Sequence, residues 1–128
     1  MDTNILGPTP SSPRSRELWL QHAAGFILFR DIRRYAVGNL DPSLNEIARS
    51  AALKAIDDAL YGAMMVIDGV TGALANSEYV VHLRTEVCLK NATTGEPIES
   101  MDLREGDGMC MGYHSWIEGD FGKDPVTV

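Results

Sequence analysis

The spacing of apolar residues changes along this chain from a helical repeat to a strand repeat. Between about residues 16 and 67, apolar side chains recur at steps of three and four, the period of an amphipathic helix. From Tyr79 onward apolar and polar residues alternate, as along a strand with one buried and one solvated face. The change of period predicts an α+β fold, with two N-terminal helices packed on one face of a small antiparallel β-meander of about three strands.

Both helices are predicted from their apolar stripes and end signals. The first runs from about Arg16 to Val37. The second starts at Ser43-Leu44-Asn45-Glu46, which has the form of a capping box, and ends at Gly69 and Gly72. The apolar positions of the first helix are Leu18, Trp19, His22, Phe26, Phe29, Ile32 and Ala36, and those of the second are Leu44, Ile47, Ala48, Ala51, Ala55, Ala59, Ala63 and Ile67. The second stripe is rich in alanine, which predicts that a partner helix approaches closely along it.

Three strands are predicted after the helices. They cover Tyr79 to Lys90, Ile98 to Leu103 and Met109 to Ile117, separated by turn segments rich in glycine, asparagine and proline. Residues 1–14, with the proline-rich stretch GPTPSSPRS, are predicted to be a disordered N-terminal tail. Residues 15–128 are predicted to form a single domain, because a chain of this length with 45% hydrophobic residues can bury a core.

The charge of the chain is negative and uneven. The formal net charge is -7, and residues 77–128 hold 10 acidic and 4 basic residues, against 8 and 7 in residues 1–76. Nucleic-acid binding is not expected, because phosphate neutralisation needs clustered lysine and arginine. The sequence therefore predicts an acidic C-terminal part suited to a basic partner.

Location is predicted from the absence of apolar export and membrane signals. The most apolar stretch, Ala23 to Phe29, is far shorter than the ~20 residues of a membrane span, and the N-terminus lacks the features of a secretory signal. Without such a signal, Cys88 and Cys110 are expected to be reduced thiols. We therefore expect a cytoplasmic protein with no membrane association.

The segment GDGMCMGYHSWIEGDFG, residues 106–122, is the part of the sequence that most resembles an active site in composition. On an extended strand Cys110 and His114 lie roughly 13 Å apart, too far to share a metal ion or a proton. Its glycines do not have the spacing of a dinucleotide fingerprint. No metal and no cofactor are expected. One alternative stays open: a small enzyme or metabolite binder with a pocket formed by Cys110, His114 and Asp107.

The leading hypothesis is a non-enzymatic module that binds a basic protein through its acidic C-terminal sheet edge. Exposed carboxylates would steer the partner, and an outward-facing tryptophan would anchor it. The residues expected at this edge are Asp102, Glu105, Asp107, Trp116, Glu118 and Asp120. One version is an immunity-type protein that neutralises a basic toxin by imitating its nucleic-acid substrate.

A homodimer is the third hypothesis. The alanine stripe of the second helix could form the dimer seam of a purely structural subunit. Alternatively, the basic positions Arg30, Arg33 and Arg34 on the first helix could pair with the acidic sheet of a second copy.

Overall fold

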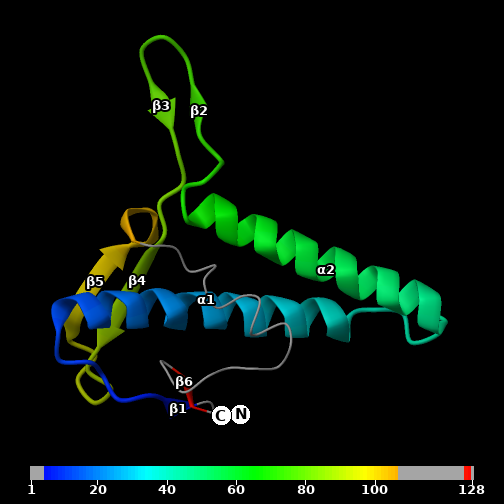
Figure 1. The fold of residues 1–128 in the computed structure, drawn as a ribbon, viewed down its shortest axis with the longest axis horizontal. Coiled ribbons are helices and arrows are strands. Elements are labelled where there is room, and N and C mark those ends of the chain that lie inside the picture. Colours follow the sequence, from blue (N-terminus) through cyan, green and yellow to red (C-terminus); the bar gives the residue numbers. More distant parts are fainter. Residues whose placement is uncertain (1–4, 107–125, 128) are drawn as a thin grey trace.

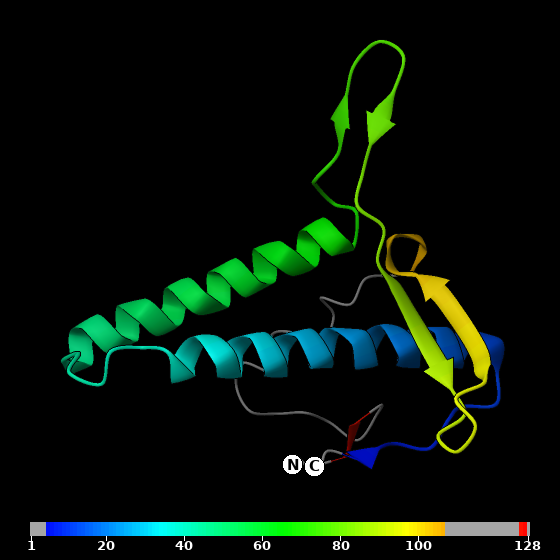
Figure 2. The same ribbon diagram turned by 180° about the vertical axis from the view of Figure 1, so that it is seen from behind.

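The computed structural model describes residues 5–106 and 126–127 of the chain. These residues form helices α1 (Pro13–Gly38) and α2 (Glu46–Ile67), a short 3₁₀ helix η1 (Leu103–Glu105) and three antiparallel strand pairs. The strands are β1 (Ile5–Leu6), β2 (Leu74–Ala75), β3 (Val80–Val81), β4 (Glu86–Lys90), β5 (Pro97–Asp102) and β6 (Val126–Thr127), paired as β1–β6, β2–β3 and β4–β5. The β4–β5 hairpin packs on α1, and α2 lies along α1 (Figure 1, Figure 2). The predicted α+β class is therefore confirmed.

The start of α1 lies three residues before the predicted one. The Ser12 side chain accepts a hydrogen bond from the Ser15 backbone N–H at 3.1 Å, and Pro13 occupies the first helical turn, where its missing N–H costs nothing. Upstream of this cap, Ile5 and Leu6 pair with Thr127 and Val126. Residues 5 and 6, which composition assigns to the tail, thus lie in a strand. Local composition does not predict this strand, because its pairing partners are more than a hundred residues away in the sequence.

The N-terminus of α2 differs from the predicted capping box. Asn45, not Ser43, caps the helix: its side-chain oxygen accepts from the Ala48 N–H at 2.8 Å. Ser43 instead donates both its backbone N–H and its hydroxyl to Asp41, in the loop before the helix. The Ser43 N–H, and secondarily its hydroxyl, lower the pKa of the Asp41 carboxyl below its ordinary value. Both residues are good caps, and the turn made by Asp41 decides between them.

Replacing Asn45 by alanine is expected to destabilise the protein by about 1 kcal/mol, because the helix loses its cap. The control, Ser43→Ala, removes the hydroxyl but leaves the cap, and we expect it to cost less than about 0.5 kcal/mol. Urea denaturation of both variants measures the difference. A larger loss for Ser43→Ala would assign the cap to the serine after all.

The C-terminus of α2 is confirmed at Gly69. The Gly69 N–H bonds the Val66 carbonyl and the Val70 N–H bonds the Met65 carbonyl, which is the Schellman pattern. Gly69 has φ +83°, a conformation that glycine adopts without strain. Gly72 follows with φ +93°, and the chain leaves the helix axis between these two glycines to enter β2.

The core lies where the middle of α1, the second half of α2 and the start of η1 meet. Its buried members are Ala24, Phe26, Phe29, Leu60, Met64 and Leu103, with Val87 of β4 packed against them. Leu60 and Met64 belong to the face of α2 that contacts α1. The alanine stripe does not, since Ala51, Ala55 and Ala59 are exposed and Ile47 is 83% exposed. Apart from Ile67, which packs against the core, α1 thus packs on Leu60 and Met64 and not along the alanine stripe, because larger side chains remove more apolar surface from water than alanine does.

The predicted first strand is interrupted. Val80–Val81 pair with β2, Glu86–Lys90 pair with β5, and the residues between them belong to neither strand. The second predicted strand is confirmed as β5, with a start at Pro97 and an end at Asp102, after which the chain turns into η1. The third predicted strand, Met109 to Ile117, lies outside the described residues.

Candidate functional site

The structure describes two of the predicted site residues, Asp102 and Glu105. The remaining members of the predicted acidic edge, Asp107, Trp116, Glu118 and Asp120, lie outside the described residues, as do Cys110 and His114 of the alternative pocket. The predicted pocket of Cys110, His114 and Asp107 therefore lies outside the described residues and stays a prediction.

Asp102 has interactions within the chain. Its side chain is 10% exposed, accepts a hydrogen bond from the Arg104 N–H at 2.9 Å and lies 3.4 Å from Nε of Arg84. Asp102 thus caps η1 and ties it to the segment before β4. Glu105, three residues later, is exposed and leaves its carboxylate to solvent.

The basic positions of α1 also have partners within the chain. Arg33 donates from Nε to Asp57 of α2 at 2.8 Å, and Arg30 donates to Asp31 at 2.8 Å. The guanidinium groups of Arg30 and Arg33 lie 5.7 Å and 5.9 Å from the rings of Phe26 and Phe29. Because Arg33 joins α1 to α2, it serves the fold rather than an open basic stripe.

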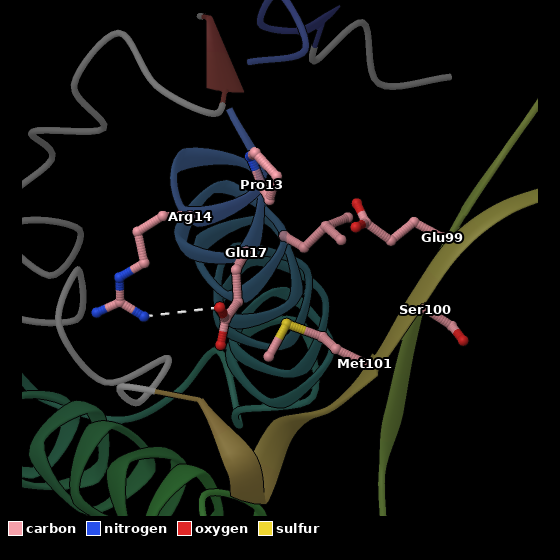
Figure 3. Close-up of a pocket in the computed structure, with 7 residues that line it drawn as sticks. Pro13, Arg14, Glu17, Glu99, Ser100 and Met101 are labelled. Atoms are coloured by element: carbon pink, nitrogen blue, oxygen red, sulfur yellow. Dashed lines mark ion pairs between the residues drawn. The ribbon is translucent and has the colours of Figure 1, made fainter. Parts of the chain in front are cut away.

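A shallow cavity of about 380 Å³ lies between the start of α1 and strand β5 (Figure 3). Its charged groups are mutually balanced: Arg14 lies 3.6 Å from Glu17, and Glu99 lies 3.6 Å from Arg16. Pro13, Leu20, Ser100 and Met101 complete the lining. Ser100, its hydroxyl-bearing residue, has no histidine among the lining residues to act as its base. The residues that line this cavity therefore do not include a nucleophile paired with a histidine as general base.

Metal-binding geometry is likewise absent from the part of the chain that the structure describes. Within residues 5–106 and 126–127, no three histidine, cysteine, aspartate or glutamate side chains come together as a metal site. Cys88 is an exposed free thiol on β4, opposite Ser100 of β5.

The most distinctive surface is the β2–β3 hairpin with its two flanking segments, residues 70–84, which we call the arm. The arm extends away from the helices and the β4–β5 hairpin (Figure 1, Figure 2). Every one of its residues is exposed. Nonetheless it carries six large apolar side chains that are at least 62% exposed: Val70, Leu74, Tyr79, Val80, Val81 and Leu83. Soluble surfaces rarely concentrate apolar residues in this way unless they contact another molecule.

One face of the arm holds most of these side chains. Leu74 is directly opposite Val81 across the strand pair, so both point to the same side. Tyr79 lies two residues before Val81 and Leu83 two residues after it, which places them on that side where the chain stays extended. We call Leu74, Tyr79, Val81 and Leu83 the apolar face. Leu74, Tyr79 and Val81 also line a hollow of about 240 Å³, together with Ala75 and Asn76.

The tip of the arm has a defined turn. The Asn76 side-chain oxygen accepts from the N–H groups of Glu78 and Tyr79, each at 2.8 Å, and the Asn76 N–H bonds the Tyr79 carbonyl at 2.9 Å. This Asx turn sets the register that places Leu74 opposite Val81. A sequence signal for the arm existed: an asparagine turn between Leu74-Ala75 and Val80-Val81. It was missed because the alternation starting at Tyr79 continues without interruption into β4.

These features define a class: a small α+β protein in which a β-hairpin arm projects from a core of two described helices and a described β-hairpin. Comparison with models of protein families, with curated proteins and with solved structures found no match. Within the described part of the chain, neither α1 nor α2 combines the length and the apolar character that crossing a membrane requires.

Proposed function

We propose that this chain is a non-enzymatic protein-binding module and that the arm is its docking element. The observation that carries the proposal is the apolar face, which the fold displays to solvent instead of burying. Leu74 and Tyr79 are 75% and 69% exposed, although the core of the same molecule buries comparable side chains almost completely.

Energetics favour a bound state for the arm. Fully burying a side chain of the size of leucine or valine stabilises by about 1.5–3 kcal/mol, so covering the apolar face can offset the entropy lost on association. A two-stranded hairpin without further support is marginally stable in water. A partner that covers the apolar face would therefore also stabilise the hairpin.

Charge indicates the chemistry of a heterologous partner. A net charge of -7 repels acidic proteins and attracts basic ones, chiefly by raising the rate of association. Glu86 and Glu105 are exposed on the described surface, and the predicted acidic edge would add Asp107, Glu118 and Asp120. A basic partner, as in an immunity-type complex, remains our proposal for this edge. A cytoplasmic location belongs to the same proposal, because an exposed free thiol at Cys88 persists best in a reducing compartment.

Site-specific photo-cross-linking tests the docking element. A photoreactive phenylalanine analogue replaces Tyr79 of the arm, or, as the matched control, Tyr35 of α1, which is 75% exposed. After irradiation of the cells that naturally produce the protein, we expect a discrete adduct from position 79 and none from position 35. The adduct should disappear when Val81 is also replaced by aspartate, because a charge on the apolar face opposes its burial.

The result that would refute the docking role is equally specific. Equal or absent cross-linking at positions 79 and 35, or an adduct that persists with Val81→Asp, would show that the arm does not form a defined interface.

A further inference from the structure

We infer that the arm is held in one direction by a clamp and that the clamp keeps the apolar face in position for its partner. The clamp consists of Asp102, Leu103 and Arg104, at the end of β5 and the start of η1. None of the three belongs to the apolar face, so they act as positioning residues. The inference rests on the proposed function, since it concerns how the same docking element is held.

The clamp holds the end of the arm that leads into β4. The Leu103 backbone N–H donates to the carbonyl of Thr85, the residue directly after the arm, at 3.0 Å. One residue earlier, Nε of Arg84 lies 3.4 Å from Oδ2 of Asp102. The other carboxylate oxygen of Asp102 accepts from the Arg104 N–H at 2.9 Å, so the carboxylate is fixed from both sides. A backbone hydrogen bond and an ion pair thus fasten this end of the arm to η1.

The clamp also contacts the chain where the arm leaves α2. The Arg104 side chain lies over Gly69, the residue directly before the arm: a Cβ at Gly69 would lie 2.8 Å from Nε and 3.2 Å from Cγ of Arg104. Gly72 approaches Val66 of α2 in the same way, since its Cβ would lie 2.9 Å from Cγ1 of Val66. Both glycines are therefore needed for these close approaches as well as for their positive φ.

The clamp is itself anchored in the core. Leu103 is 2% exposed and packs in the cluster that contains Phe26, Leu60 and Met64. The turn of η1, orange in Figure 1, lies beside the base of the arm in both views (Figure 1, Figure 2). Three consecutive residues therefore connect both ends of the arm to the core, the part of a protein that opens least often.

A fixed arm matters for binding because a freely moving arm would lose its freedom when a partner covers it. Ordering a mobile element lowers affinity, and holding it in its bound position beforehand avoids that loss. The arm has little to fix its direction by itself, since its two paired strands have two residues each. We therefore expect loss of the clamp to weaken docking, although the clamp lies outside the docking face.

Nitrogen-15 NMR relaxation of the isolated chain tests the clamp. The measured quantity is the order parameter of each backbone amide, about 0.85 in rigid backbone and below about 0.6 in flexible segments. In the original chain we expect the amides of β2 and β3 to match those of α2. In the double variant Arg84→Gln/Arg104→Ala we expect the arm amides to fall below about 0.6 while α2 keeps its values. Residual dipolar couplings of the same amides report slower swinging, and those of the arm should shrink towards zero in the double variant.

Two single variants serve as controls. Arg49→Gln removes the same charge as Arg84→Gln from an exposed arginine of α2, and it should leave the order of the arm unchanged. Arg84→Lys keeps a cation beside Asp102 and should retain most of that order. Arg84→Gln alone should give arm order parameters between those of the original chain and the double variant. Because the Arg84 side chain is 65% exposed, this variant is expected to fold, and it tests the clamp even if Arg104→Ala unfolds the chain.

The outcomes separate the clamp from the docking function, because the relaxation measurements need no partner. Flexible arm amides in the original chain, or arm amides that do not change in Arg84→Gln, would overturn the clamp. A rigid arm without an adduct at position 79 would support the clamp and remove the docking function. An adduct from an arm that is already mobile would leave the docking function and remove the clamp. If both hold, the adduct yield at position 79 should fall in the double variant.

Discussion

Replacing Leu103 by alanine is expected to lower the free energy of unfolding by about 2–5 kcal/mol. Leu103 is 2% exposed and belongs to the cluster with Phe26, Phe29, Leu60 and Met64, although it starts η1 at the end of the β4–β5 hairpin. It therefore joins the β4–β5 hairpin to the helical core, together with the partly buried Val87 of β4. Its truncation leaves a cavity whose walls belong to separate elements, and such walls relax only in part.

Denaturant titration of Leu103→Ala measures this loss, with Ile98→Ala as the control. Ile98 lies in the same hairpin but is 56% exposed, so its truncation should cost less than about 1 kcal/mol. Domains of this size are stable by only about 5–15 kcal/mol, so the Leu103 variant should unfold at a clearly lower denaturant concentration. Similar losses for the two variants would contradict the position of Leu103 in the core.

Replacing Asp57 by alanine is expected to cost about 1–3 kcal/mol. The Asp57 side chain is 11% exposed and accepts a hydrogen bond from Nε of Arg33 at 2.8 Å, joining α2 to α1. Removing the carboxylate leaves the Arg33 guanidinium over Phe29 without this partner, and Arg33 keeps partial access to water. That access keeps the expected loss below the value for a fully buried pair.

The neighbouring residue provides the control for Asp57. Asp58 pairs with Lys54 within one turn of the same helix, but both side chains are more than 60% exposed. Asp58→Ala should therefore cost less than about 0.5 kcal/mol, although it removes the same charge from the same helix. Thermal unfolding of the two variants makes the comparison, and equal effects would show that the Arg33 contact contributes nothing beyond general charge.

The candidate site was predictable from the sequence only in part. Asp102 and Glu105 were singled out for their charge, yet the Asp102 carboxylate is engaged by Arg84 and by the backbone of η1. A count of charges cannot show this, because it does not reveal which carboxylates have a partner. The arm was missed because Tyr79, Val81, Val87 and Leu89 fit one alternating pattern, and alternation does not say where a strand changes its pairing partner.

Local signals were sufficient for the features that short stretches of chain encode. The two described helices follow from the three- and four-residue spacing, the end of α2 from Gly69, and the turn before β5 from Asn91 and Gly95. Each of these features depends on hydrogen bonds between residues at most five positions apart, so the residues that form it lie close together in the printed sequence. The sequence by itself therefore determined the two helices, the end of α2 and the strand β5, but not β1, β2 or η1.

Tertiary structure alone decided which faces these elements bury. The α2 sequence offers an alanine stripe and a stripe with Leu60 and Met64, and contact with Phe26 and Phe29 of α1 selects the second. Likewise β4 finds its partner in β5, whereas Val80 and Val81 pair only with the short β2 and remain exposed. The physical reason is that burial depends on the area two surfaces remove from water together, a property of both partners that neither segment carries alone.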